Sequence, residues 1–167
     1  MIRPLGGAPE YEHNPGRGKA RFAEQQRESM AVDLATPILV VDDFGTMVRI
    51  MRHFLKQLGF RNVDDASDGA EALQKLQERR YGLVISDWNM EPMTGYELLE
   101  AVRGNEELAA LPFIMVTAES KTDNVMAAKQ AGASNYIVKP FNAATLAGKI
   151  EKVLGGRLGA EATISAH

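Results

Sequence analysis

A regular alternation of short apolar runs with helical patterns, between residues 37 and 154, restricts the fold of this chain more than any other feature. The runs are rich in β-branched residues and cover residues 38–42, 62–66, 83–87, 113–117 and 136–139, of which the second is the weakest. Each run is followed by apolar residues at helical spacing. Parallel strands are joined by right-handed helical crossovers, so the alternation predicts an α/β fold: a doubly wound, five-stranded parallel sheet with five flanking helices.

Capping residues and glycines mark where these helices begin and end. Asp68 and Thr94 each stand three positions before a glutamate, as in a capping box, and predict the starts of the second and third helices. Gly59 and Gly132 predict the ends of the first and fourth helices. Asn142 is positioned to cap the fifth.

The two flanking segments differ from the central region in composition. Residues 1–36 are rich in Gly, Pro and balanced charge, which predicts a largely disordered extension before a domain at residues 37–154. Met30 is an alternative biological start, and one sequence leaves that choice open. Residues 155–167 are expected to form a flexible tail.

Charge and composition exclude several classes of protein. A formal net charge of -3 argues against binding to nucleic acid or to an anionic membrane surface. The chain has no cysteine, which excludes disulfides and thiolate metal sites and suits a reducing compartment. No apolar run approaches the length of a membrane span, and the N-terminus lacks a signal-peptide pattern, so we expect a soluble, cytoplasmic protein.

Polar residues stand at the carboxyl ends of the predicted strands. Asp42 and Asp43 end the first, Asp87 the third, Thr117 the fourth and Lys139 the fifth. Parallel α/β sheets bind ligands at this edge, and the strand order 2-1-3-4-5 opens a crevice between strands one and three. The sequence therefore predicts that the three aspartates meet in that crevice.

The chemistry of these side chains suits a phosphoryl group beside a metal. Carboxylates about 5 Å apart repel by about 3 kcal/mol per pair at an effective dielectric of about 20, so a cation must compensate. Donors that are all oxygen favour a hard divalent ion such as Mg²⁺. Lys139 and Thr117 add an ammonium and a hydroxyl that would bind phosphoryl oxygens. The residues thus predict aspartyl-phosphate chemistry at Asp87.

Four stretches of the chain carry a resemblance to a known family. They read ILVVDDFGTMVRIMRHFLKQLGF, YGLVISDWNM, IMVTAES and QAGASNYIVKPFNAATL. They resemble the receiver domains of two-component response regulators, most closely the single-domain chemotaxis regulators of the CheY type. The resemblance covers residues 37–154 and implies a monomeric phosphoacceptor, loaded by a histidine kinase, that assists its own phosphorylation and dephosphorylation without being a separate enzyme.

The resemblance also implies a role for each site residue. Asp87 would be the phosphoacceptor, and Thr117 and Lys139 would bind the phosphoryl group. The Mg²⁺ ligands would be Asp42, Asp43, Asp87 and the main-chain carbonyl of Asn89.

Further implied roles concern switching, hydrolysis and output. Thr117 and Tyr136 would form the switch, and the bond before Pro140 would be cis. Asn89 and Glu119 would tune hydrolysis. The partner-binding face would comprise Ser120, Lys121, Tyr136, Val138 and Lys149.

Several outputs fit such a domain. The resemblance favours phosphorylation-dependent binding to the flagellar motor switch, with a phosphatase as a further partner, and leaves a phosphate sink or a phosphorelay intermediate as alternatives. A more distant alternative is an aspartyl-phosphate phosphohydrolase, which would place an acid two residues after its nucleophile, where this chain has Asn89. A flavin or nucleotide site is disfavoured, because the loop DDFGTM offers two acids to a phosphate.

Overall fold

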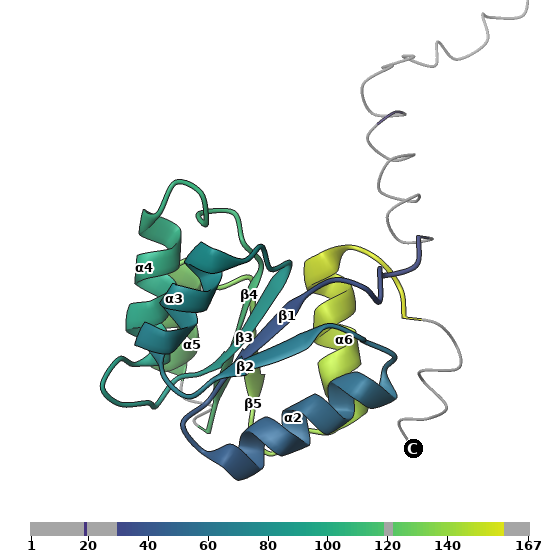
Figure 1. Cartoon of the computed structure of the whole chain (residues 1–167), viewed down its shortest axis with the longest axis horizontal. Coiled ribbons are helices and arrows are strands. Elements are labelled where there is room, and N and C mark those ends of the chain that lie inside the picture. The colour runs from purple at the N-terminus through teal and green to yellow at the C-terminus, as the bar shows by residue number, and fades with distance from the viewer. Residues whose placement is uncertain (1–18, 20–29, 119–121, 159–167) are drawn as a thin grey trace, which may run out of the picture.

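A three-layer α/β architecture is seen in the computed structural model, which describes residue 19, residues 30–118 and residues 122–158. Within these residues, one parallel sheet has the strand order β2-β1-β3-β4-β5. Its strands are β1 (Ile38–Val41), β2 (Val63–Ala66), β3 (Leu83–Asp87), β4 (Phe113–Thr117) and β5 (Asn135–Val138). The helices between and after them are α2 (Gly45–Gln57), α3 (Gly69–Glu78), α4 (Gly95–Gly104), α5 (Thr122–Gln130) and α6 (Ala143–Leu154) (Figure 1). The predicted doubly wound sheet and its strand order are confirmed.

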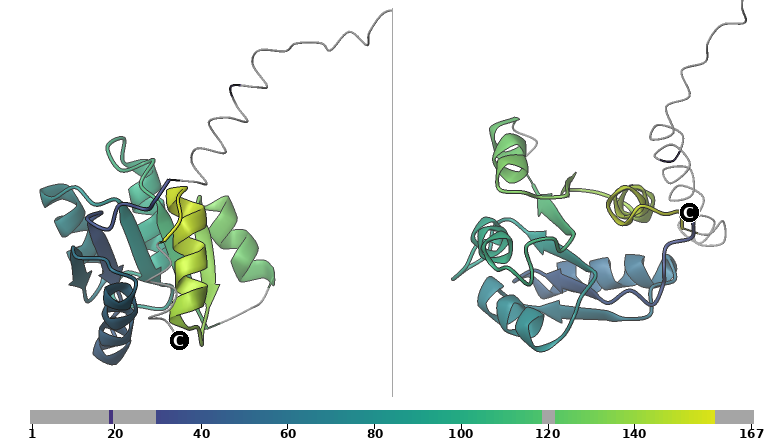
Figure 2. Two further views of the ribbon diagram at one scale, coloured as in Figure 1. Left: turned by 90° about the vertical axis from the view of Figure 1, so that its right-hand side faces the viewer. Right: turned by 90° about the horizontal axis from the view of Figure 1, so that it is seen from above.

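The sheet is buried on both faces. Helices α2 and α6 cover one face, and α3, α4 and α5 cover the other, as Figures 1 and 2 show. Successive residues of β1 alternate between the two layers: Ile38 and Val40 pack with α2 and α6, whereas Leu39 and Val41 pack with α3 and α4. Burial of one such side chain contributes about 1.5–3 kcal/mol, which is why the runs are apolar throughout.

The helices begin and end at the predicted signals. The side chains of Asp68, Thr94 and Asn142 each accept a hydrogen bond from the backbone N–H three residues on, at 2.8, 3.1 and 2.8 Å. Gly59 and Gly132, which follow α2 and α5, have φ values of 99° and 97°. Only glycine adopts this left-handed conformation without strain, so both glycines end their helices as expected.

The packed unit is longer than the predicted domain of residues 37–154. Ala31 pairs with Arg157 in a parallel bridge, and the N–H of Val32 donates to the Arg157 carbonyl at 2.9 Å. Val32 and Leu158 are 8% and 7% exposed and join the core layer of α2 and α6.

Residues 30–36 and 155–158 are therefore ordered parts of the domain, although composition assigned them to the extension and the tail. Each stretch contributes only one to three apolar side chains, too few to reveal the packing. The disorder expected for residues 1–29 and 159–167 is not tested, because of these residues the structure describes only residue 19.

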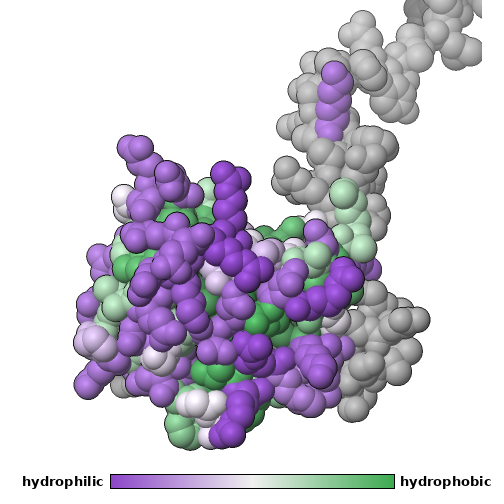
Figure 3. All heavy atoms as spheres, in the orientation of Figure 1, coloured by the Kyte–Doolittle hydropathy of each residue, from purple (hydrophilic) through white to green (hydrophobic). Residues whose placement is uncertain are grey.

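The outer surface shown in Figure 3 is mainly hydrophilic over α2 and α3. In the part of the chain that the structure describes, none of the helices combines the length and the apolar composition needed to cross a bilayer.

Candidate functional site

The acidic side chains meet where β1 and β3 end. Asp42 directly follows β1, Asp87 is the last residue of β3, and the two strands are neighbours in the sheet. Each of Asp42, Asp43 and Asp87 offers a carboxylate oxygen that lies within 4.8 Å of the other two. The predicted convergence of the three aspartates at this edge of the sheet is confirmed.

Asp42 is the most enclosed of the three. Its side chain is 6% exposed, whereas Asp43 is exposed to solvent. Its Oδ1 accepts a hydrogen bond from the Phe44 N–H at 2.9 Å. Burial raises the pKa of the Asp42 carboxyl, and the neighbouring Asp87 carboxylate raises it further, against the lowering effects of the Phe44 N–H and the Lys139 ammonium.

Lys139 supplies the positive charge of the site. It follows β5, and its Nζ lies 3.0 Å from Asp87 Oδ1 and 3.8 Å from Asp42 Oδ2. The bond from Lys139 to Pro140 is cis, as predicted, and the Lys139 N–H donates to the Thr117 carbonyl at 2.8 Å. The ammonium therefore offsets part of the repulsion between the buried Asp42 carboxylate and the partly buried Asp87 carboxylate.

Thr117 lies beside this group at the end of β4. It is 4% exposed, and the preceding residue, Val116, is aligned with Asp87 in the neighbouring strand. The Trp88 N–H donates to the Val116 carbonyl at 2.9 Å, which ties the loop after Asp87 to β4. Adjacent strands thus place the hydroxyl-bearing Thr117 at the same edge of the sheet as Asp87.

Gly95 supports the phosphoacceptor candidate, a role that no sequence pattern indicated. A Cβ added at Gly95 would lie 2.0 Å from the main-chain oxygen of Asp87. The Gly95 N–H donates to the Trp88 carbonyl at 2.8 Å, so the start of α4 packs directly on the backbone that carries Asp87. The TGYE motif signalled only the helix start; the close approach depends on tertiary structure.

Among the predicted switch and output residues that are described, Thr117 ends β4, and Tyr136, Val138 and Lys149 lie on β5 and α6. Tyr136 and Val138 are partly buried on β5, an edge strand of the sheet. Lys149 of α6 places its Nζ 4.9 Å from the centre of the Tyr136 ring and 3.2 Å from Asn135 Oδ1. The structure thus brings Tyr136 and Lys149 into contact.

The other predicted positions are less informative. Asn89 is exposed two residues after Asp87, and its role as a main-chain metal ligand stays a prediction. Glu119, Ser120 and Lys121 lie outside the described residues.

The donors of the site fit a hard divalent cation. Three carboxylates against one ammonium leave a formal charge of -2 when all are ionised (-3 + 1 = -2). The cluster offers carboxylate oxygen and neither imidazole nor thiolate, which favours Mg²⁺ over zinc. Asp42, Asp43 and Asp87 are therefore suited to hold such an ion.

Comparison with known proteins gives the family. Residues 38–151 match the response regulator receiver domain. The chain belongs to the response regulator receiver family. This receiver domain is 51% identical over 116 residues to the chemotaxis protein CheY of Pseudomonas aeruginosa, a match that covers 70% of this chain and 94% of that protein. It is 49% identical over 116 residues to the chemotaxis protein CheY-3 of Vibrio cholerae, and this match covers 70% of this chain and 89% of that protein.

Solved structures agree with this assignment. The receiver domain superposes on the chemotaxis response regulator CheY4 of Vibrio cholerae with a TM-score of 0.68 and 38% identity, covering 72% of this chain and 99% of that one. It also superposes on the receiver domain of the sensor histidine kinase PA1611 from Pseudomonas aeruginosa, which was solved with a magnesium ion in its active-site cleft. The TM-score is 0.67 and the sequence identity 27%, and the match covers 72% of this chain and 98% of that one. The chain is thus a receiver domain of the CheY type, a class that acts as a phosphoacceptor in two-component signalling.

Proposed function

We propose that Asp87 takes a phosphoryl group from the phosphohistidine of a histidine kinase and that this changes the affinity of the domain for a protein target. The contact that supports this most directly is the 3.0 Å approach of Lys139 Nζ to Asp87 Oδ1, beside the acid pair Asp42 and Asp43. A lone strand-end aspartate would be a turn or cap residue. An aspartate held between a cation and two further acids suits phosphoryl transfer.

The transfer needs one bond exchange. A carboxylate oxygen of Asp87 forms a bond to phosphorus while the P–N bond of the donor breaks, and the departing imidazole takes up a proton. Lys139 holds one phosphoryl oxygen by its ammonium, and Thr117 donates its hydroxyl to another. Asp42, Asp43, Asp87 and the main-chain carbonyl of Asn89 would hold Mg²⁺, which would supply further positive charge to the phosphoryl oxygens.

The signal then leaves through the β5 and α6 side of the domain. The phosphoryl group draws the Thr117 hydroxyl toward it and biases an equilibrium between two arrangements, which Tyr136 reports at the surface. The output face consists of Ser120, Lys121, Tyr136, Val138 and Lys149. Asn89 and Glu119 tune the hydrolysis that ends the signal, which the domain assists itself and a phosphatase accelerates.

The target that fits best is the flagellar motor switch, because the similar proteins from Pseudomonas aeruginosa and Vibrio cholerae are chemotaxis proteins. A cytoplasmic monomer that shuttles from kinase to motor suits this task. A motor effector must gain affinity on phosphorylation, whereas a phosphate sink or relay intermediate need not.

A peptide from the N-terminus of a motor-switch protein distinguishes these outputs. We expect it to bind the beryllofluoride-loaded domain at least about tenfold more tightly than the metal-free domain, a difference of about 1.4 kcal/mol. Lys149→Glu should weaken that binding. Equal affinity in both states, with rapid return of phosphate to the kinase, would select the sink.

The phosphoacceptor is tested by Asp87→Asn. This variant should lose all labelling by acetyl phosphate or by a phosphorylated kinase while it keeps its circular dichroism spectrum. Asp123→Asn, at an exposed position in the first turn of α5, is the matched control and should label normally. Base-labile phosphate that persists on Asp87→Asn would refute the assignment.

A further inference from the structure

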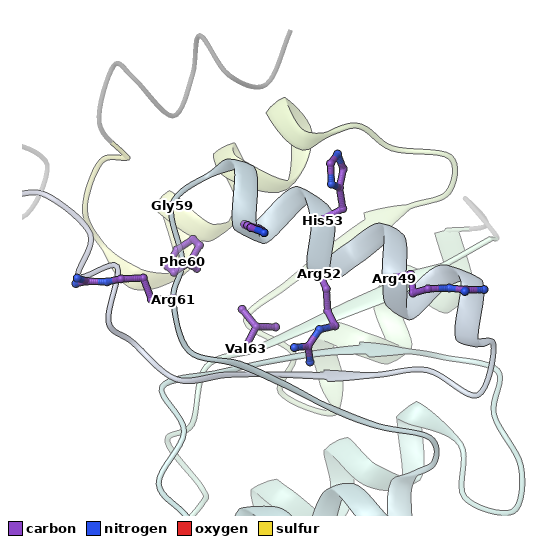
Figure 4. Close-up of a pocket in the computed structure, with 8 residues that line it drawn as sticks. Arg49, Arg52, His53, Gly59, Phe60, Arg61 and Val63 are labelled. Carbon is purple, nitrogen blue, oxygen red and sulfur yellow. The ribbon is translucent and has the colours of Figure 1, made fainter.

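Cationic side chains follow the outer side of α2 and continue past its end. They surround a hollow of about 630 Å³ whose lining also includes Gly59, Phe60 and Val63 (Figure 4). We call this set the basic strip: Arg49, Arg52, His53, Lys56 and Arg61.

The basic strip is elongated. Its helical members recur every three or four residues and therefore share one side of α2, and the rise from Arg49 to Lys56 is about 10 Å. Arg61 extends the strip beyond the turn that Gly59 opens. In Figure 4 the side chains of Arg49, Arg52 and Arg61 spread apart along this line and do not converge on one point.

Most of the charge of the strip is uncompensated. Arg52 pairs with Asp65 of β2 at 2.7 Å between Nη1 and Oδ2. Arg49, Lys56 and Arg61 form no ion pair with a carboxylate among the residues that the structure describes. Leaving His53 out of the count, the four Arg and Lys cations and the Asp65 anion give the strip a formal charge of +3 (4 - 1 = 3), in a chain whose formal net charge is -3.

The packed residues 30–36 hold one end of the strip in place. The Arg61 N–H donates to the Leu34 carbonyl at 3.1 Å, and the side-chain amide of Asn62 donates to the Ala35 carbonyl at 2.8 Å. Leu34 also lies against Gly59. The strip therefore belongs to the folded domain and needs no partner in order to form.

The strip extends away from the phosphorylation site. Asp43 stands just before α2; along the helix axis from Gly45, Arg49 lies about 6 Å away and Lys56 about 16 Å away. Val63 begins β2 at the amino edge of the sheet, opposite the carboxyl edge where Asp87 lies. A molecule bound here would leave both the acidic crevice and the β5 and α6 side open.

We propose that the basic strip binds an acidic segment of a partner protein. The spread of the cations matches carboxylates repeated along a polypeptide, and complementary charge would speed association and fix the orientation of the partner. A small anion is a poorer match, because a small-molecule pocket needs converging polar groups and apolar walls. Here the cations diverge, and Phe60, which is only 4% exposed, offers little apolar surface to a ligand. Duplex nucleic acid is disfavoured by the net negative charge of the chain.

The test uses a fluorescein-labelled peptide of about twelve glutamates as the probe and follows its anisotropy as the full chain is added. Binding should weaken steeply as salt shortens the Debye length from about 10 Å at 0.1 M to about 3 Å at 1 M. The double variant Arg49→Glu with Lys56→Glu should lower the affinity by at least about tenfold, because two attractions become repulsions. The matched control is Arg80→Glu with Lys152→Glu, which makes the same change in net charge at two exposed positions outside the strip.

The outcomes separate clearly. A loss confined to the strip variant, with unchanged acetyl phosphate labelling at Asp87, supports the proposal. Equal losses in both variants would show a response to net charge alone and overturn it. Salt-insensitive binding, no binding, or tighter strip-dependent binding to duplex DNA or to phosphatidylserine vesicles would also overturn it.

Discussion

Gly95 is a position without a side chain that packs against the backbone of Asp87, the proposed phosphoacceptor. A Cβ there would lie 2.0 Å from the Asp87 oxygen and 2.9 Å from its carbonyl carbon, so the backbone that carries Asp87 must move to admit it. We expect Gly95→Ala to cost about 1–3 kcal/mol in the free energy of unfolding, by analogy with overpacking, and to slow phosphorylation by acetyl phosphate. Urea unfolding and the rate of labelling measure the two effects.

A second glycine serves as the control for this substitution. A Cβ at Gly148 would meet no atom within 4 Å, and this residue lies exposed inside α6. Gly148→Ala should therefore raise the stability by about 0.5–1 kcal/mol, the helix-propensity gain over glycine. If both variants changed stability in the same direction, the close approach at Gly95 would not be the cause.

Asp42 gives the site a dependence on pH. The folded-state pKa of its carboxyl is raised from 3.8, so the protonated form favours folding below that value, and this contribution is lost as the pH rises through the raised pKa. At neutral pH, without divalent ions, the ionised Asp42 therefore lowers the stability. Asp42→Asn should raise the free energy of unfolding at pH 7, because it removes the cost of burying a charge and the repulsion from Asp87 and Asp43, which together outweigh the lost attraction to Lys139.

The pH series identifies the origin of that gain. Thermal melts in chelator should show it at pH 7 and show it shrinking as the pH falls toward 4, because the wild-type carboxyl then takes up its own proton. A gain that is constant with pH would point to packing, and a loss at pH 7 would contradict the electrostatic account.

Among the elements, α6 begins at a side-chain cap, Asn142. Asn142 Oδ1 accepts hydrogen bonds from the Thr145 N–H at 2.8 Å and from its hydroxyl at 3.0 Å, two residues after the cis Pro140. Asn142→Ala should cost about 1 kcal/mol, whereas Asn142→Asp keeps the acceptor and should cost little. Equal losses for the two variants in urea unfolding would show that the cap bond is not what stabilises this end.

The strands and the acidic site were predictable because their signals are local. A parallel strand buried on both faces is apolar along its length, and its functional residue follows at the carboxyl end, so Asp42, Asp87 and Lys139 could be placed before any contact was known. Even β2, which contains Asp64 and Asp65, was predicted from its place in the alternation.

Contacts made to backbone groups were not predictable. The guanidinium of Arg103 donates to the carbonyls of Gly132, Leu111 and Ala109, at 2.9, 2.6 and 3.1 Å, and burial lowers its pKa. Carbonyl oxygens occur in every residue, so no pattern of side chains marks them as partners. The approach of Gly95 to the Asp87 backbone escaped prediction for the same reason.

At the scale of the whole molecule, we expect the stability of the domain to require residues 30–36 and not residues 1–29. Removing residues 1–29 should leave the melting temperature and phosphorylation unchanged. Removing residues 1–36 also takes away Val32 and Leu34, which pack against the core, and should cost about 3 kcal/mol or more. That corresponds to a fall of about 6–12 °C in Tm by differential scanning calorimetry.

A fall of several degrees after removal of residues 1–29 alone would show that the extension docks on the domain. No difference between the two deletions would contradict the packing of Val32 and Leu34.

The bridge between Ala31 and Arg157 places the first and last residues of the folded unit side by side. A short Gly/Ser linker from residue 158 back to residue 30 would span neighbouring backbone, and the chain could be opened between the exposed Glu106 and Glu107. Such a circular permutant would begin before β4 and deliver Asp87 near its end. Its register and its acidic crevice would be unchanged, so acetyl phosphate should still label it: the phosphoacceptor chemistry follows from which strands are neighbours, whatever their order of synthesis.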